Sequence, residues 1–224
     1  MIKIINLTIK CKKIFIFKKI NFFIKKNNIY VIIGNNGIGK STLSKSFIKD
    51  ENYLYSGEII FSKNNLFFFK TDYISRFGIF YSYQNSIDIF NIKNIFFLKI
   101  CYNIFNLNNI YFYKLIKFYK KNIFYNKQLL FRYYNYGFSG GEKKKNDFLF
   151  LILINPCFII LDEIDSGLDF NSFFFISNYL NIIKKKKYII IISHNKNINN
   201  ILLINNYIIL KKNKIIFTSC IKNI

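Results

Sequence analysis

One short stretch constrains this chain more than any other, because it matches the pattern G-x-x-x-x-G-K-[ST]. The stretch reads Gly34, Asn35, Asn36, Gly37, Ile38, Gly39, Lys40, Ser41 and Thr42. A shuffled chain of this composition would contain on the order of 0.004 such matches, so chance does not explain it. The apolar run Ile29–Ile33 precedes the stretch, and a helical pattern at Lys40–Ile48 follows it. The sequence therefore predicts a buried strand, a glycine-rich loop and a helix in direct succession.

A loop of this kind binds phosphate through its backbone. Successive N–H groups curl around the anion, and glycine tolerates the backbone angles and the close approach that this requires. The helix that begins near Lys40 adds its positive N-terminal end. Lys40 is expected to contact the β- and γ-phosphates of a nucleotide, and the Ser41 hydroxyl is expected to bind Mg²⁺. The loop therefore predicts a nucleotide site that uses Mg²⁺.

The composition accounts for the high positive charge without a nucleic-acid partner. Lys and Arg number 34 against 11 Asp and Glu, which gives a formal net charge of +23. A charge of this size by itself suggests nucleic acid or an anionic membrane surface. However, Lys, Asn, Ile, Phe and Tyr are all abundant while Ala is absent, and the abundant residues share codons built from A and T. We interpret the lysines as a solvated surface shaped by an AT-rich genome, and expect no specific nucleic-acid partner.

Apolar runs predict the strands of an α/β fold. Residues 2–9 and 14–24 alternate apolar and polar side chains, which predicts two antiparallel strands. Phe158–Leu161 and Tyr188–Ile192 are short and wholly apolar, as in strands buried on both faces of a parallel sheet. Further short strands are expected at Gly57–Phe61, Gly78–Tyr83, 206–210 and 214–217.

The middle of the chain has a different character. From about Asn85 to Arg132 it contains neither Gly nor Pro, and its apolar residues recur with a roughly helical period. We therefore expect a helical subdomain at about 85–150, inserted into a single α/β domain that spans residues 1–224. A hydrophobic content of 52% is enough to bury the core of such a domain.

Cysteine spacing and hydropathy indicate the kind of cellular compartment. The cysteines are far apart and form no C-x-x-C pair, which argues against a zinc site or a disulfide framework: Cys11, Cys101, Cys157 and Cys220. No apolar run reaches the roughly 18–20 residues that span a bilayer, and the N-terminus does not resemble a signal peptide. We expect a reducing compartment without membrane insertion, either a bacterial-type cytoplasm or a plastid stroma.

Two carboxylates, Asp162 and Glu163, directly follow the apolar run Phe158–Leu161. In parallel α/β sheets the carboxyl ends of the strands are where ligands bind. Asp162 is expected to reach Mg²⁺, and Glu163 to orient or deprotonate the water that attacks the γ-phosphate. The phosphate loop upstream is what makes this pair of acids a candidate catalytic site.

A second glycine cluster precedes a predicted helix that starts near Lys143. It consists of Ser139, Gly140, Gly141 and Glu142. A hydroxyl and unobstructed N–H groups at a helix N-terminus can bind an anion. The same residues also form the pattern of a capping box, in which Ser139 and Glu142 bond each other's backbone.

Two polar residues at predicted strand ends complete the candidate site. His194, the single histidine, ends the apolar run Ile189–Ser193, and a neutral imidazole there can bond the γ-phosphate or hold the attacking water. Gln84 closes the predicted strand Gly78–Tyr83 and can contact Mg²⁺ and the same water. Both are predicted to be catalytic.

The order of these motifs resembles that of the ABC-type ATPases, over essentially the whole chain. The order is the loop at 34–42, Gln84, Ser139–Glu142, Leu161–Glu163, Ser166–Asp169 and His194. Three stretches are similar to the SufC family, the ATPase subunits of the SUF iron–sulfur cluster assembly machinery: Gly78–Ile89, Gly137–Asp147 and Leu161–Asp169.

The resemblance implies an ABC-type nucleotide-binding domain that hydrolyses ATP with Mg²⁺. It implies a head-to-tail dimer, in which Ser139–Glu142 of one copy cover the ATP on the loop of the other and Asp169 links the two sites. Phe15 falls near the place where the family stacks an aromatic ring on adenine. SufB-like and SufD-like scaffold subunits would be the partners. Ile38 departs from the family, which has a small residue there.

Three other interpretations remain open on sequence grounds. The first is the ATPase subunit of an ABC membrane transporter, which would couple to a membrane partner through residues 85–135. The second is a basic nucleic-acid-binding protein, although its lysines form no single stripe. The third is an ATPase that binds nucleotide without hydrolysing it, in a chain where the residues for hydrolysis are nonetheless present.

Overall fold

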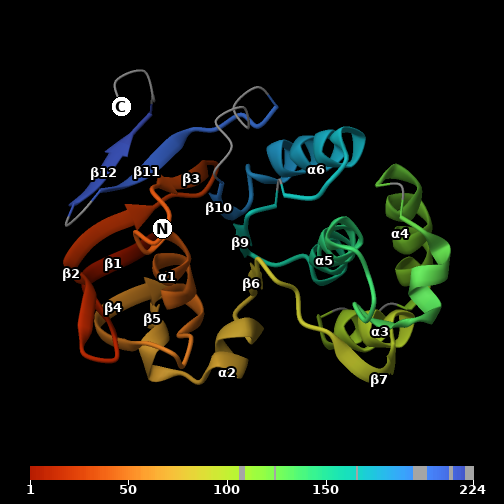
Figure 1. The fold of residues 1–224 in the computed structure, drawn as a ribbon, viewed down its shortest axis with the longest axis horizontal. Helices are drawn as coiled ribbons and strands as arrows, with labels where there is room; N and C mark the ends of the chain where they lie inside the picture. Colours follow the sequence, from red (N-terminus) through yellow and green to blue (C-terminus); the bar gives the residue numbers. More distant parts are fainter. Residues whose placement is uncertain (106–108, 124, 165, 194–200, 212–213, 220–224) are drawn as a thin grey trace.

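The strand that leads into the glycine-rich loop lies inside the central sheet of the computed structural model (Figure 1). The structure describes residues 1–105, 109–123, 125–164, 166–193, 201–211 and 214–219. Within these ranges the central sheet has six strands in the order β12-β11-β3-β10-β9-β6. They are β3 (Ile29–Gly34), β6 (Ile79–Ser82), β9 (Phe158–Asp162), β10 (Tyr188–Ile192), β11 (Asn206–Lys211) and β12 (Lys214–Thr218).

Most of this sheet is parallel. β11, β3, β10, β9 and β6 pair in parallel with their neighbours, and among the described strands of this sheet only β12 runs antiparallel, paired with β11. β9 and β10 are buried at every position, which confirms that their apolar runs are central strands. Because parallel strands end at the same edge, the residues that follow β3, β6, β9 and β10 are brought to one side of the sheet.

A second, antiparallel sheet forms a flank. Within the described residues it contains β1 (Ile2–Cys11), β2 (Ile14–Ile24), β4 (Leu54–Phe61) and β5 (Asn64–Asn65), in the order β2-β1-β4-β5. β1 pairs with β2 from Ile2 opposite Ile24 to Cys11 opposite Ile14. The two antiparallel strands that the alternating pattern predicts are therefore confirmed.

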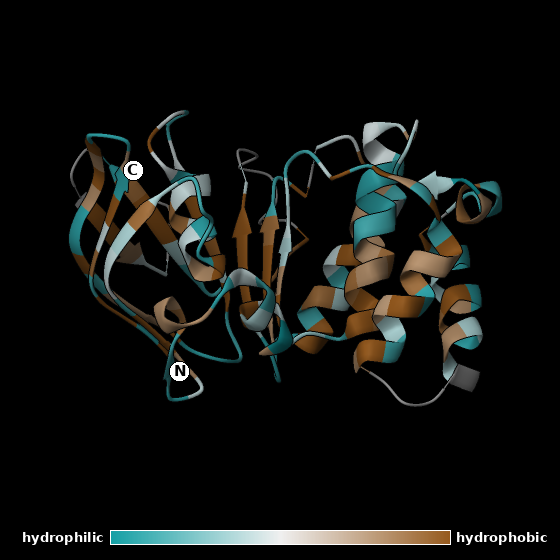
Figure 2. Ribbon diagram, turned by 90° about the horizontal axis from the view of Figure 1, so that it is seen from below, coloured by the Kyte–Doolittle hydropathy of each residue, from teal (hydrophilic) through white to brown (hydrophobic). Residues whose placement is uncertain are grey.

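The two faces of the central sheet bury separate cores. Along β9, Phe158 and Ile160 pack on the side of the flank, whereas Ile159 and Leu161 pack on the helical side. α1 (Lys40–Lys45), the 3-10 turn η1 (Ser46–Ile48) and α2 (Thr71–Arg76) contribute to the first core, and α5 (Gly140–Ile154) and α6 (Phe170–Ile183) to the second. Figure 2 shows the brown central strands between the flank and the helices.

The segment predicted as a helical insertion contains helices and a short sheet. Its elements are β7 (Ile89–Lys93), α3 (Asn94–Phe105), α4 (Asn109–Asn122), the 3-10 turn η3 (Lys127–Phe131) and β8 (Tyr133–Tyr134). The sequence predicts a helical subdomain here, and the β7–β8 pair is an addition that it does not predict. It joins strands far apart in sequence with an irregular register, which a local periodicity does not reveal. None of the helices in the described ranges combines the length and apolar character needed to cross a bilayer.

A network of four buried polar side chains links residues 87–135 to α5. The four are Asn94, Tyr125, Asn135 and, on α5, Asn146. Asn146 accepts hydrogen bonds on Oδ1 from Asn94 Nδ2 at 2.8 Å and from the Tyr125 hydroxyl at 2.9 Å. Its Nδ2 donates to Asn135 Oδ1 at 2.8 Å, and Asn135 Nδ2 donates in turn to the Ile87 carbonyl at 3.0 Å. All three asparagines are fully buried, so the polar atoms that make these bonds depend on one another in place of water.

Replacing Asn146 tests how much this network stabilises the fold. We expect Asn146→Ala to lower the free energy of unfolding by about 2–4 kcal/mol, because it removes the acceptor of the buried Tyr125 hydroxyl, one acceptor of Asn94 Nδ2 and the donor to Asn135 Oδ1. Urea denaturation measures the change. Asn171→Ala, at an exposed position of α6, is the matched control and should change stability by less than about 0.5 kcal/mol. Equal effects of the two substitutions would contradict the structural importance of the network.

Candidate functional site

The glycine-rich loop connects the end of β3 to the start of α1. Gly39 precedes the first residue of α1 with φ of 103°, a left-handed conformation that favours glycine. A Cβ at Gly39 would come within 3.0 Å of the Phe17 ring and 2.9 Å of Ile16 on β2. The flank therefore packs directly against the loop, and only glycine fits at this contact.

Lys40 is held inside the loop that it belongs to. Its side chain is buried, and its Nζ donates to the carbonyl oxygens of Gly34 at 2.8 Å and Asn35 at 3.0 Å. Burial lowers the pKa of the lysine, while the negative charges of Glu163 and Asp162 raise it. The ammonium group is thus placed at the centre of a loop of backbone N–H groups, where an anion would meet it.

A cavity of about 540 Å³ opens beside the loop. Its lining joins loop residues to two residues from distant strand ends: Asn36, Gly37, Gly39, Lys40, Ser41, Thr42, Gln84 and Glu163. Gln84 follows β6 and Glu163 follows β9, so the parallel sheet brings both to the loop. The structure therefore brings together most of the residues that the sequence predicts to contact phosphate or water.

Gln84 and Glu163 contact each other directly. Gln84 Nε2 donates to Glu163 Oε2 at 2.8 Å. The backbone of Glu163 is left-handed, with φ of 53°, and its N–H donates to the Ile192 carbonyl at 3.0 Å. A non-glycine residue in this conformation is uncommon and is held only when its surroundings fix it, as at many active sites. The turn after β9 thereby directs the Glu163 side chain to the cavity.

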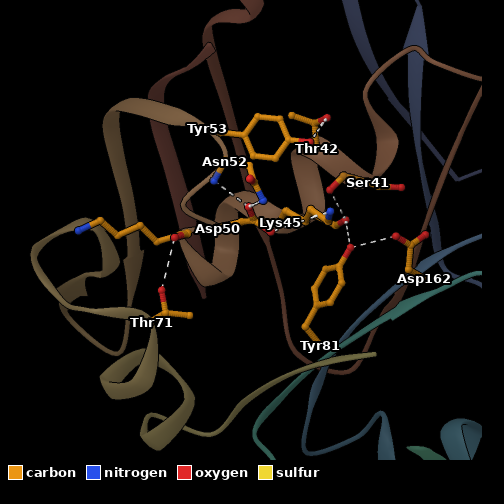
Figure 3. A network of polar contacts seen from close by, with 11 residues as sticks. Ser41, Thr42, Lys45, Asp50, Asn52, Tyr53, Thr71, Tyr81 and Asp162 are labelled. Atoms are coloured by element: carbon orange, nitrogen blue, oxygen red, sulfur yellow. Dashed lines mark hydrogen bonds and ion pairs between the residues drawn. The ribbon is translucent and has the colours of Figure 1, made fainter. Parts of the chain in front are cut away.

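Asp162 ends β9 beneath the loop and is almost completely buried. The Tyr81 hydroxyl donates to Asp162 Oδ2 at 2.9 Å (Figure 3). Burial raises the pKa of the Asp162 carboxyl, and the hydroxyls of Tyr81 and Ser41 oppose the rise. Burial also raises the pKa of Tyr81 far above its ordinary value, so its phenol keeps its proton.

The donors near Asp162 fit a magnesium ion. Oδ1 of Asp162 is a buried oxygen that accepts no hydrogen bond from the described residues. Such an atom is costly to bury unless a partner satisfies it. The Ser41 hydroxyl is close by, and Mg²⁺ prefers oxygen ligands of these two kinds. Asp162 and Ser41 are therefore the residues that can hold Mg²⁺, directly or through water.

The second glycine cluster forms the start of α5, and the capping box is confirmed. Glu142 Oε2 accepts from the Ser139 N–H at 2.8 Å, and Ser139 Oγ accepts from the Glu142 N–H at 3.3 Å. A Cβ at Gly141 would lie 2.3 Å from the Gly167 carbonyl oxygen, whereas a Cβ at Gly140 would meet nothing within 4 Å. Gly141 is therefore packed against the backbone of Gly167, whereas Gly140 faces open space.

This cluster lines a different cavity from that of the phosphate loop. The second cavity, of about 510 Å³, is lined by Phe138, Gly140, Lys143, Lys144, Ser166, Gly167, Asn85 and Ser86, together with Gln84 and Glu163. Gln84 and Glu163 line both cavities. The two predicted anion sites of this chain therefore border cavities that share Gln84 and Glu163.

Lys144 is a structural residue of the site that motif analysis missed. It is buried, and its Nζ donates to the carbonyl oxygens of Tyr83 and Asp162, each at 3.0 Å. These carbonyls lie at the ends of β6 and β9, so α5 is fastened to the sheet edge that carries Gln84 and Glu163. The sequence does place Lys144 two residues after the capping-box glutamate. However, lysines are so abundant in this chain that this position does not distinguish Lys144 from the others.

Asp169 and Phe15, which the sequence predicts to contact nucleotide, are not among the residues that line the phosphate-loop cavity. Asp169 caps α6 by accepting from the Ser172 N–H at 2.8 Å, and it pairs with Lys145 at 2.6 Å. The Lys145 contact, with help from Ser172, lowers the pKa of Asp169 to about 2. Phe15 is exposed, with the ammonium groups of Lys10 and Lys18 over its ring. His194 lies outside the described residues.

Comparison with known sequences identifies the family. A model described as ABC transporter matches residues 17–166, more than half of the chain. The chain belongs to the ABC transporter family. Curated relatives include the probable ATP-dependent transporter ycf16 of Cyanophora paradoxa, 35% identical over 174 residues that cover 74% of this chain and 67% of the relative. Another is the probable ATP-dependent transporter slr0075 of Synechocystis sp., 35% identical over 192 residues, 82% of this chain and 75% of the relative.

Solved structures confirm the predicted fold as that of an ABC ATPase nucleotide-binding domain. An ATP binding subunit of an ABC transporter superposes with a TM-score of 0.85 at 18% identity, covering 98% of this chain and 90% of the other. A dimeric post-hydrolysis state of the ATP-binding cassette MJ0796, bound to ADP and Pi, superposes with a TM-score of 0.80 at 18% identity, covering 98% of both chains.

The two adjacent glycines of α5 give a matched pair of variants of this ABC ATPase. We expect Gly141→Ala to lower the free energy of unfolding by about 1–3 kcal/mol, because its Cβ would collide with the Gly167 carbonyl. Gly140→Ala meets open space and should leave stability unchanged or slightly raised, since Ala favours helix over Gly. Chemical denaturation of both variants measures this. Equal stability of the two variants would refute the close packing of α5 on residues 166–167.

Proposed function

We propose that this ABC ATPase hydrolyses ATP with Mg²⁺ as a SufC-like subunit that powers iron–sulfur cluster assembly on SufB-like and SufD-like scaffold partners. The observation that supports ATP hydrolysis most strongly is the single cavity shared by the phosphate loop, Gln84 and Glu163. The SUF role is supported by the similarity of residues 137–147 and 161–169 to the SufC family. The expected location is a bacterial-type cytoplasm or a plastid stroma.

Each residue of the cavity has a part in the proposed reaction. Lys40 and the loop N–H groups bind the β- and γ-phosphates, and Glu163 orients or deprotonates the attacking water. Gln84, which already bonds Glu163, holds the same water and contacts the metal. Asp162 and Ser41 hold Mg²⁺, which when bound neutralises charge on the phosphate oxygens. His194 is proposed to bond the γ-phosphate from the end of β10.

We also propose that the active form is a head-to-tail dimer. Ser139 and Gly140 do not line the phosphate-loop cavity of their own chain, and Gly140 faces open space. A second copy can present these residues to the γ-phosphate, which adds the N-terminus of α5 to the site. Asp169, fixed by Lys145, then lies on the segment that links the two sites. Phe15 is proposed to stack on the adenine ring.

Glu163→Gln tests the assigned catalytic role. We expect kcat for ATP to fall about 10²–10⁴-fold, because the amide cannot act as a base, while ATP affinity stays near that of the wild type. A phosphate-release assay and nucleotide titration measure the two effects separately. Glu58→Gln on β4, an exposed acid of the flank, is the control and should retain full activity. A purified complex whose rate is unchanged by Glu163→Gln would contradict the proposed chemistry.

The ATPase subunit of a membrane transporter is the second candidate, and two relatives named as probable ATP-dependent transporters favour it. Either partner needs a surface on this chain. α3 exposes Phe96, Ile100 and Ile104 at successive intervals of four residues, which places them along one face of the helix. We assign partner contact to this face of α3.

Substitution on α3 combined with a choice of partner separates the two candidates. We expect SufB-like and SufD-like subunits to co-purify with the chain and to raise its ATPase rate, and Ile100→Asp to abolish that rise without lowering the basal rate. Ile14→Asp, at an exposed apolar position of the flank, is the control and should keep the stimulation. Stimulation by a membrane permease alone would instead support the transporter role.

A further inference from the structure

Tyr81 lies where one phenol group can hold the Asp162 carboxylate. β6 and β9 are parallel neighbours, and Tyr81 is opposite Ile160. Asp162 is two residues beyond Ile160, so it shares a face of the sheet with Tyr81 and lies diagonally across from it. An aromatic side chain reaches a diagonal neighbour, and the Tyr81 hydroxyl donates to Asp162 Oδ2 at 2.9 Å. Figure 3 shows the hydroxyl directed at the carboxylate.

The same hydroxyl also contacts the helix that follows the phosphate loop. Ser44 Oγ on α1 lies 3.2 Å from the Tyr81 oxygen and 3.0 Å from the Ser41 carbonyl oxygen. Each hydroxyl has one proton, and an ionised carboxylate can only accept. Tyr81 therefore gives its proton to Asp162, so the single proton of Ser44 can go either to the Tyr81 oxygen or to the Ser41 carbonyl. The contacts form a chain from the Ser41 carbonyl through Ser44 and Tyr81 to Asp162.

We propose that Tyr81 is a positioning residue for Mg²⁺, because it holds Oδ2 of Asp162 and thereby keeps Oδ1 directed to the ion. This inference rests on the proposed function, since it requires that Asp162 serves the metal. Oδ1 is the buried oxygen that accepts no hydrogen bond from the described residues, so the two oxygens of one carboxylate are already differentiated. Removing a group that orients a metal ligand typically weakens metal binding about 10–100-fold.

Tyr81→Phe deletes the hydroxyl and keeps the ring. We expect the affinity of the ADP-loaded protein for Mn²⁺, used in place of Mg²⁺ and measured by electron paramagnetic resonance, to fall about 10–100-fold. Affinity for ADP in the presence of EDTA should stay unchanged, because the loop is intact. In turnover, the Mg²⁺ concentration for half-maximal rate should rise, whereas kcat at saturating Mg²⁺ should largely recover.

Tyr83→Phe is the matched control. Its ring centroid lies 4.8 Å from that of Tyr81, so the variant removes an equivalent hydroxyl from the adjacent ring. Among the hydrogen bonds of the described residues, none joins Tyr83 to Asp162, and Mn²⁺ affinity should equal that of the wild type. The thermal midpoint of nucleotide-free protein checks that both variants fold. If Tyr81→Phe does not fold, Tyr81→Leu also lacks the hydroxyl and takes its place.

The outcomes separate this inference from the proposed function. Wild-type Mn²⁺ affinity in Tyr81→Phe, in a protein whose parent hydrolyses ATP, overturns the role of Tyr81 and leaves the ATPase intact. An equal loss in Tyr83→Phe also overturns it, because the effect would then come from general disturbance of β6. A wild-type protein that neither binds nor hydrolyses ATP defeats the proposed function itself, and the role of Tyr81 with it.

Discussion

Parallel pairing of β3, β10, β9 and β6 is the constraint on which the site depends. It brings the phosphate loop, Gln84 and the two acids to one edge of the sheet, although they are distant in sequence. Lys144 joins α5 to this edge of the sheet, because its buried ammonium group donates hydrogen bonds to the carbonyls at the ends of β6 and β9. The same bonds fix the start of α5, and this explains why Gly140 borders a cavity that also contains Glu163.

Local patterns in the sequence were sufficient for the strands and for the loop. The apolar runs of β3, β9 and β10, the alternation of β1 and β2, and the glycine spacing of 34–42 each reflect a physical requirement of their own segment. The capping box at Ser139 was equally local. The β7–β8 pair was not predicted from the sequence, because its two strands are distant in the chain and no local period records such a pairing.

The side chains that stabilise the site could not be identified from the sequence, for a different reason. Lys144, Tyr81 and Asn146 are residue types that this chain also carries in abundance at positions where they are exposed. From composition alone, such residues are expected on a solvated surface. Many of the lysines are indeed exposed. Burial distinguishes these three residues from the rest, because each must then find specific partners within the fold. Only the tertiary structure shows which lysine, tyrosine or asparagine is buried.

An ion pair and several hydrogen bonds join α5 to the end of β6 and to the segment that follows it. The bonds are those of Lys143 with Asp88 at 2.6 Å, of Asp147 with Ser82 at 3.1 Å and Ser86 at 2.6 Å, and of Asn146 through Asn135 with the Ile87 carbonyl. Gln84 lies within this segment and bonds Glu163. A continuous set of hydrogen bonds therefore connects this segment, α5 and Glu163. The helical segment and the Glu163 carboxylate are thus joined by hydrogen bonds within one chain, so any partner that contacts this segment has a bonded path to Glu163.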